Sequence, residues 1–254
     1  MEVSFPFNHI FIGIGNNGSL IVRNIGIESS KRVIIDTSDY LLNKRVFVDE
    51  IEGFFKNVER NSIVWMIFER KPTNIEIAKL IDFYLPGDVM RLAYVLTPYI
   101  ELVNTKKPKW AENFETVFYD SLWEVLSEYK EVSLKDAFNR AGMSIGEMFT
   151  KLYEYLENNM LVNVDYADFF AMIKGGNVGI IRLIRDIDFT WHWGIWDRGL
   201  INIMAGRRVP LSHAHRILNN FQDILGEKDI IWGVQIKEDA EEEVEVLALL
   251  IKRW

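Results

Sequence analysis

The regular structure of the chain is predicted to begin within residues 10–19, which read IFIGIGNNGS. A short apolar run is followed by a loop that contains three glycines, and residues 20–25 have the apolar pattern of a helix. A strand, a glycine loop and a helix in this order favour anion binding, because backbone N–H groups at a helix N-terminus carry partial positive charge. Glycines at such positions also serve tight turns in proteins without a ligand, so both interpretations stay open. The candidate ligand-binding residues of this loop are Gly13, Gly15, Asn16, Asn17, Gly18 and Ser19.

The same alternation of strand and helix continues through the first half of the chain. Buried strands are predicted at 33–35, 62–68 and 91–96, with a helix at 74–84. This order predicts an α/β domain with a Rossmann-type parallel sheet that has helices on both faces. Asp36 and Asp39 directly follow the strand at 33–35, where they suit either a helix-capping turn or contact with a ribose or a metal ion.

A long amphipathic helix marks the middle of the chain. Ser133 and Asp136 form a capping-box pattern, and the apolar residues that follow lie on one stripe as far as about residue 158. A helix of this length is long enough to cross one domain and join it to another. The sequence therefore predicts a nucleotide-binding-like domain at 1–132, a central linking helix at 133–159 and a C-terminal domain at 160–254.

The last part of the chain has a different pattern of elements. Strands are predicted at 180–187, 200–204, 230–236 and 244–251, with a helix at 211–225. The C-terminal domain is therefore predicted to be α+β, with its last two strands in hairpin-like order. The acidic segment 237–243 is then interpreted as the solvated tip of that hairpin.

Composition excludes several classes of function. The chain has 254 residues and a formal net charge of −8, which argues against nucleic acid or an anionic membrane surface as its main partner. It contains no cysteine, so disulfides, thiolate nucleophiles and cysteine-bound metals are excluded. No apolar run reaches the length of a membrane span, and the first residues do not resemble a secretion signal. We therefore expect a cytoplasmic protein without membrane insertion.

Several short motifs resemble FtsZ, the prokaryotic relative of tubulin. Residues 200–206 (LINIMAG) and 230–236 (IIWGVQI), with a helix between them, resemble the C-terminal domain of that family. The loop NVDYAD at 163–168 looks like the family's synergy loop, NVDFAD, and likewise follows a long helix. Residues 36–39 (DTSD) resemble the family's NTD turn, and 119–122 and 134–138 resemble the segments that lead into its central helix. The motifs occur in the family's order along the chain.

The resemblance implies a two-domain tubulin/FtsZ-like fold and a mode of action. In FtsZ, GTP on one subunit is hydrolysed when the next subunit of the filament inserts its synergy loop, whose carboxylates position the attacking water. Asn163, Asp165 and Asp168 stand at the matching positions and are the candidate catalytic residues, acting on a neighbouring subunit. The alternative is that the two aspartates only cap the following helix. The implied cofactor is GTP or GDP, with magnesium when nucleotide is bound.

The departures from the family are as informative as the matches. FtsZ proteins wrap the nucleotide phosphates with a second glycine loop, GGGTGTG, whereas this chain has ERKPTN at 69–74. Pro72 lacks an N–H, and flexible cations are a less specific substitute for a backbone cradle. Asn16, Asn17 and Ser19 replace glycines of the first loop, and Arg23 replaces a base-contacting asparagine. The resemblance therefore identifies a shortened and divergent member.

These observations predict an FtsZ-like cytoskeletal or cell-division protein with a degenerate GTP site. Its partners would be FtsZ-like subunits, either further copies of itself or a paralogue, and its own nucleotide site would be weakened or lost. One alternative is an active GTPase that polymerises by itself. A second is an enzyme that uses a dinucleotide, since Asp36 lies about 20 residues beyond the glycine loop. No resident metal site is predicted, because His213 and His215 are two apart and point in different directions on a helix.

Overall fold

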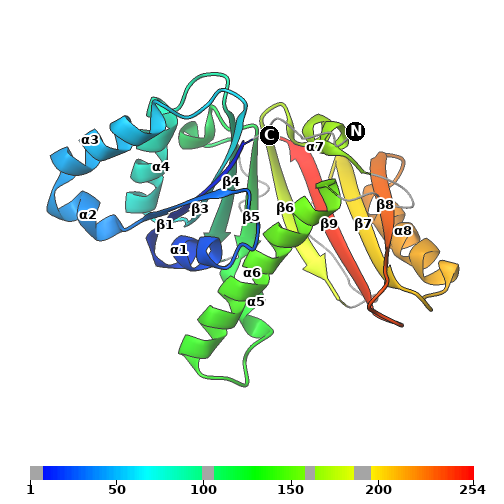
Figure 1. Ribbon diagram of the computed structural model, residues 1–254. Coiled ribbons are helices and arrows are strands. Elements are labelled where there is room, and N and C mark those ends of the chain that lie inside the picture. Colours follow the sequence, from blue (N-terminus) through cyan, green and yellow to red (C-terminus); the bar gives the residue numbers. More distant parts are fainter. Residues whose placement is uncertain (1–7, 99–105, 158–163, 186–195) are drawn as a thin grey trace. The chain divides into compact units, whose positions relative to one another are not determined.

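The chain forms two units, each of which contains several hydrogen-bonded β-strands (Figure 1). The structure is a computed structural model that describes residues 8–98, 106–157, 164–185 and 196–254. Of these, unit 1 holds the residues up to 98 and 106–147, and unit 2 holds the remainder from residue 148.

Unit 1 alternates strands and helices as the sequence predicts. Its elements are β1 (Asn8–Ile14), α1 (Gly15–Arg23), β2 (Lys31–Ile35), α2 (Thr37–Leu42), α3 (Lys44–Phe55), β3 (Ser62–Glu69), α4 (Pro72–Tyr84), β4 (Met90–Thr97), the 3₁₀ helix η2 (Lys109–Ala111), β5 (Thr116–Ser121), α5 (Leu122–Ser127) and the first part of α6 (Leu134–Glu157). The strands pair in parallel in the order β2-β1-β3-β4-β5. The predicted parallel α/β domain is therefore confirmed.

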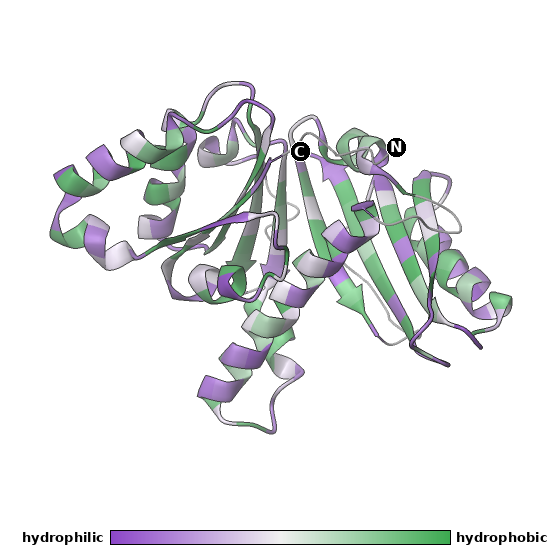
Figure 2. Cartoon of the chain, in the orientation of Figure 1, coloured by the Kyte–Doolittle hydropathy of each residue, from purple (hydrophilic) through white to green (hydrophobic). Residues whose placement is uncertain are grey.

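The central strands of unit 1 are buried along almost their whole length. In β3 every residue from Ser62 to Phe68 is buried, and β4 is buried from Arg91 to Thr97. Strands with helices on both faces read as continuous apolar runs, and Figure 2 shows the strands largely in green. Strand β5 and helix α3 were not among the predicted elements, and α2 was indicated only by the capping turn at Asp36. Helix α1 begins at Gly15 rather than at residue 20, because the glycine loop itself supplies its first turn.

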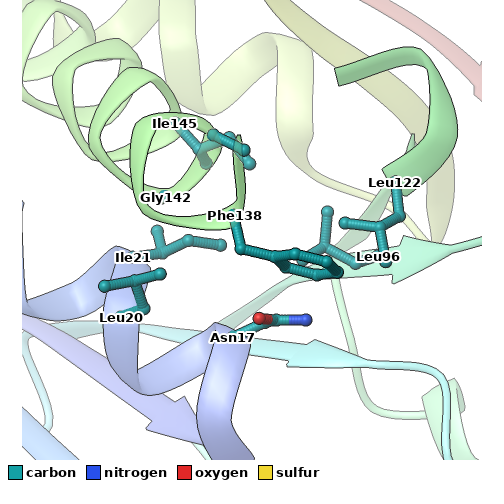
Figure 3. Close-up of a pocket in the computed structure, with 9 residues that line it drawn as sticks. Asn17, Leu20, Ile21, Leu96, Leu122, Phe138, Gly142 and Ile145 are labelled. Atoms are coloured by element: carbon teal, nitrogen blue, oxygen red, sulfur yellow. The ribbon is translucent and has the colours of Figure 1, made fainter. Parts of the chain in front are cut away.

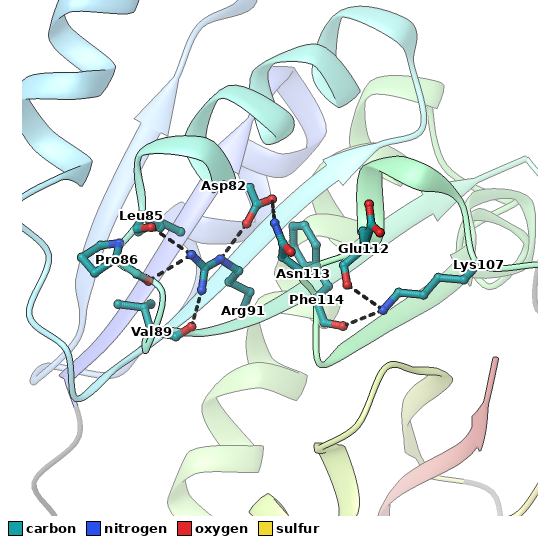
Figure 4. Close-up of polar contacts among 9 residues, drawn as sticks. All are labelled: Asp82, Leu85, Pro86, Val89, Arg91, Lys107, Glu112, Asn113 and Phe114. Atoms are coloured by element: carbon teal, nitrogen blue, oxygen red, sulfur yellow. Dashed lines mark hydrogen bonds and ion pairs between the residues drawn. The ribbon is translucent and has the colours of Figure 1, made fainter.

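A buried arginine fixes the connection between α4 and β4 (Figure 4). The Nε atom of Arg91 donates to Asp82 Oδ1 at 2.6 Å, and the guanidinium also donates to the carbonyl oxygens of Leu85, Pro86 and Val89. Asp82 Oδ2 accepts a further bond from Asn113 Nδ2 at 2.8 Å. The charge of this pair is thus fully engaged within unit 1, as a buried charge requires.

Helix α6 confirms the predicted long helix. Ser133 caps it, since the Asp136 N–H donates to Ser133 Oγ at 3.2 Å and the Ser133 hydroxyl donates to Asp136 Oδ2 at 2.6 Å. The residues of α6 up to Glu147 belong to unit 1, and those from Met148 belong to unit 2. Figure 2 shows purple and green alternating along this helix, as an amphipathic pattern should.

Unit 2 contains four strands that form a mixed sheet. Its elements after α6 are α7 (Tyr166–Ile173), β6 (Asn177–Ile184), β7 (Arg198–Gly206), α8 (Leu211–Leu225), β8 (Asp229–Lys237) and β9 (Val244–Arg253). The strand order is β6-β9-β7-β8. Strand β9 is antiparallel to both β6 and β7, whereas β7 and β8 are parallel and are joined through α8.

The predicted hairpin of the last two strands is wrong. Strand β9 lies between β6 and β7, and β8 pairs with β7 instead. The physical reason is burial: β9 is buried from Val244 to Ile251 and needs neighbours on both sides, whereas most of β8 is only half-buried. The acidic segment after β8 therefore passes the end of β7, where Gly206 N donates to Glu243 O at 2.8 Å and Glu241 pairs with Arg207 and Arg208.

Candidate functional site

The register of the parallel strands brings the two predicted ligand-binding segments, together with the segment that begins at Glu69, to one edge of the sheet in unit 1. Ile14 pairs with Ile35 of β2 and with Phe68 of β3, so the three strands end level with one another. The residues that follow are Gly15, Asp36 and Glu69, all at carboxyl ends of parallel strands. In open α/β sheets this edge is where ligands bind.

Two glycines of the first loop are explained by packing. A Cβ atom at Gly18 would lie 2.0 Å from the Ile67 carbonyl oxygen, and one at Gly13 would lie 2.5 Å from the Gly18 oxygen. These residues therefore let α1 approach β1 and β3 closely. Gly15 has a different reason, because its φ of +71° is one that residues with a side chain rarely adopt.

The remaining predicted residues of the edge line an open pocket of about 370 Å³. Its lining consists of Gly15, Asn16, Ser19, Leu20, Arg23, Ile34, Asp36 and Asp39. Five of the eight residues predicted to bind a cofactor therefore meet in one place, while Gly13, Asn17 and Gly18 do not line it. The pocket combines one guanidinium, two carboxylates and two aliphatic side chains, which suits hydrogen bonding to a polar ligand of nucleoside size.

Asp36 has the capping role that the sequence allows. It is the N-cap of α2, and its Oδ1 atom accepts bonds from Ser38 N at 2.9 Å and Ser38 Oγ at 2.7 Å. These bonds from Ser38 lower the pKa of Asp36 and keep it ionised. Asp39 lies in the first turn of the same helix. Both side chains belong to exposed residues, so capping does not remove either from the pocket.

The segment after β3 lies where FtsZ proteins have their second glycine loop. Its side chains bond to one another and to Asn17 of α1. The Glu69 side chain is only 14% exposed, and its Oε1 accepts from Asn17 Nδ2 at 2.5 Å. Its Oε2 pairs with Lys71, and Asn74 Nδ2 donates to the Glu69 carbonyl oxygen at 2.9 Å. Pro72 occupies the first turn of α4. Sequence reasoning described this segment only as a lost loop and missed Glu69 and Asn74.

A second, smaller space lies beside helix α1 (Figure 3). It is lined almost entirely by apolar residues of α1, β4, α5 and α6, with Asn17 at one side. Its volume of about 10 Å³ has room for roughly one water molecule. A Cβ atom at Gly142 would lie 2.6 Å from Leu20 Cγ, so this is a packing contact between α1 and α6 rather than a ligand site.

The predicted catalytic aspartates lie at the start of α7 in unit 2. Asp165 is the N-cap: its Oδ1 accepts from Asp168 N at 3.0 Å, and Asp168 Oδ2 accepts from Asp165 N at 3.2 Å. This reciprocal capping box is the structural role that the sequence allowed for both residues. Each of these two bonds uses one oxygen of a half-buried carboxylate. Asn163, the third predicted residue, lies outside the described residues.

Among the described residues, no group of three or more histidine, aspartate or glutamate side chains is arranged to hold a metal ion. None of the helices described is long and apolar enough to cross a membrane.

Sequence comparison finds the relatives that the motifs indicate. No family model matches the chain. The cell division protein FtsZ 2 of Pyrococcus furiosus is 22% identical over 174 residues, which is 58% of this chain and 42% of that protein. FtsZ 2 of Halobacterium salinarum is 24% identical over 183 residues, or 61% of this chain and 46% of that protein. The matched region thus spans less than half the length of these curated relatives.

Comparison of structures extends the likeness to nearly the whole chain. An empty FtsZ dimer from M. jannaschii matches with a TM-score of 0.67 at 17% identity, covering 96% of this chain and 88% of that one. CetZ2 from Haloferax volcanii, solved as a protofilament bound to GTPγS, matches with a TM-score of 0.67 at 11% identity, covering 97% of this chain and 94% of that one. In sequence the chain is similar to FtsZ 2 proteins, and it shares the fold of FtsZ and CetZ structures.

Proposed function

We propose that this chain is a cytoplasmic, filament-associated cell-division protein with a degenerate GTP site. It docks through the start of α7 onto the GTP-bearing end of an FtsZ-like subunit, either a further copy of itself or a paralogue. Asp165 and Asp168 then act on the GTP of that partner. Similarity to FtsZ 2 proteins supports the class of function.

The proposal rests on the proline and the side-chain bonds in the segment after β3. FtsZ proteins place a glycine-rich phosphate loop there, which requires free backbone N–H groups and room for an anion. This chain has Pro72, which offers no N–H, and the Glu69 carboxylate bound to Asn17 and Lys71. The residues present therefore do not fit the phosphate chain of GTP, although the neighbouring pocket fits its nucleoside part.

The chain keeps the acidic residues that belong to the other half of a tubulin-like filament contact. A head-to-tail filament contact has two unlike halves, so one chain can keep one half and lose the other. The capping box holds Asp165 and Asp168 in a fixed first turn of α7. Each carboxylate has a second oxygen with which to orient water on a docked partner.

The test is phosphate release by the FtsZ of the same host, measured with the chain added in equal amount. Wild type should stimulate release. Because asparagine is as good an N-cap as aspartate, the double variant Asp165→Asn, Asp168→Asn should fold and still dock but lose most of the stimulation. Positioned carboxylates typically contribute about 10² to 10⁴ in rate.

The control separates chemistry from folding. Asp223 also lies on a helix of unit 2, in α8, outside the capping box, so Asp223→Asn should stimulate like wild type. A wild-type chain that has no effect on phosphate release contradicts the proposal. Equal stimulation by the double variant would leave the two aspartates with their capping role alone.

A second candidate function is favoured by the pocket itself. Asn16, Ser19, Asp36 and Asp39 meet around about 370 Å³ of space, as in a retained nucleotide site. CetZ2 in its GTPγS-bound protofilament and TubZ of Bacillus thuringiensis in its GDP-form protofilaments share the fold. On this reading the chain is a self-polymerising GTPase. GTP hydrolysis and sedimentable polymer formed by the purified chain alone would establish it over the first proposal.

A further inference from the structure

We infer that the Glu69 carboxylate takes the place of a bound anion where the N-termini of α1 and α4 meet. It thereby prevents phosphate from binding at this edge of the sheet. The inference rests on the proposed function, because it names the group that makes the GTP site degenerate. It assigns to Glu69 a role in excluding anionic ligands.

The N-termini of two helices lie at this junction, and neither helix has a side chain that neutralises the partial positive charge of its N-terminus. Helices α1 and α4 directly follow the adjacent parallel strands β1 and β3. The N-cap residues, Ile14 and Lys71, form no side-chain capping bond, and neither helix has an acidic residue in its first turn. Both ends therefore present partial positive charge with no acid of the helix to balance it.

The two ends are in direct contact. A Cβ atom at Gly15, the first residue of α1, would lie 3.2 Å from Oδ1 of Asn74 in the first turn of α4. Asn74 is 3% exposed, and its Nδ2 donates to the carbonyl oxygen of Glu69. Glu69, as the last residue of β3, is thus held beside both helices.

The Glu69 side chain supplies the missing negative charge. Its carboxylate bonds to Asn17 in the first turn of α1 and to Lys71 before α4, so it links the two helix starts. A carboxylate that is 14% exposed needs such partners, since burial without them is costly. It therefore acts as an internal replacement for a bound anion.

The consequence is selection against phosphate. A phosphate group at this junction would meet a like charge and would find Asn17 and Lys71 already engaged. Like charges placed together are unfavourable, so a polyanion is rejected while the neighbouring polar pocket stays open. The junction is also complete without nucleotide, so the fold of unit 1 does not depend on one.

The test compares pyrophosphate binding by wild type and Glu69→Ala, by calorimetry and by thermal denaturation without magnesium. Wild type should show no shift of its melting temperature. Glu69→Ala should melt at a lower temperature, regain stability with pyrophosphate and bind it about tenfold more tightly than wild type. Glu69→Gln keeps the size of the side chain, removes its charge and carries the same test should the alanine variant fail to fold.

Glu59→Ala is the matched control. Glu59 accepts a bond from Asn8 Nδ2 at 2.6 Å just before β3 begins, so its loss removes a similar bond far from the junction, and no response to pyrophosphate is expected. Equal pyrophosphate affinity in wild type, Glu69→Ala and Glu69→Gln would overturn the inference. That result would leave the docking proposal standing, because docking is measured separately, on the host FtsZ.

Discussion

At the scale of single residues, the buried Arg91 side chain holds the turn between α4 and β4 in place. Its guanidinium satisfies Asp82 and three carbonyl oxygens, with 7% of the arginine side chain exposed. Arg91→Ala should lower the free energy of unfolding by about 3 to 5 kcal/mol, because it leaves the Asp82 charge buried without its cation. Urea denaturation measures the loss.

The control for this prediction is an exposed ion pair of the same unit. Arg60 and Asp88 lie 3.5 Å apart with 85% and 52% of their side chains exposed. Arg60→Ala should cost less than about 1 kcal/mol. A similar small loss for Arg91→Ala would mean that water reaches Asp82 once the guanidinium is gone.

His9 gives unit 1 a pH dependence. Burial on β1 lowers its pKa to about 4 from the ordinary 6.5, so the unfolded chain takes up a proton more readily than the folded one. Well above pH 6.5, His9 is neutral in both the folded and the unfolded chain and contributes no slope. As the pH falls from 6.5 to 4, stability should fall by about 1.4 kcal/mol per pH unit.

Comparison with His9→Leu isolates this effect, because other titrating groups are common to both chains. The difference in unfolding free energy between the two should be constant above pH 7 and should move against wild type by on the order of 3 kcal/mol near pH 4. Parallel profiles for wild type and variant would mean that folded His9 is accessible to protons.

At the scale of elements, α6 shows how the fold depends on a buried apolar stripe. Phe149 is fully buried, and Phe149→Ala should cost about 3 to 5 kcal/mol through lost burial and the cavity left behind. Met143→Ala on the same helix is the control, since that side chain is 58% exposed and should change the melting temperature little. An unchanged midpoint for Phe149→Ala would contradict the packing of this helix.

The elements themselves were largely predictable, but their pairing was not. Hydrophobic runs located β3, β4, β7 and α8 to within a few residues. Strand β9, in contrast, was paired wrongly with β8, because a short polar connection between strands usually indicates a hairpin. The better signal was the unbroken apolar run of β9, which indicates a central strand with neighbours on both sides.

The candidate site was predictable where it depends on backbone geometry and unpredictable where it depends on side-chain contacts. Gly15 and Asp36 are brought to one edge by parallel strand register, which sequence pattern can indicate. The hydrogen bond between Asn17 and Glu69 joins residues that are 52 apart in sequence, so no local sequence pattern predicts it. Asp165 and Asp168 have one spacing that serves both capping and catalysis, so the pattern cannot separate the two roles.

For the whole molecule, the central expectation is that the phosphates of GTP add little or nothing to binding. Each lost charge-assisted contact to phosphate is worth about 1.5 to 3 kcal/mol, so losing several weakens affinity by orders of magnitude. The pocket lined by Asn16, Ser19, Asp36 and Asp39, at about 370 Å³, has room for the nucleoside part alone. Guanosine and GTP with magnesium should therefore bind with similarly weak affinity in calorimetric titrations of wild type. A sub-micromolar dissociation constant for GTP, far below that of guanosine, would show a working phosphate site despite Glu69 and Pro72 and would favour the self-polymerising GTPase.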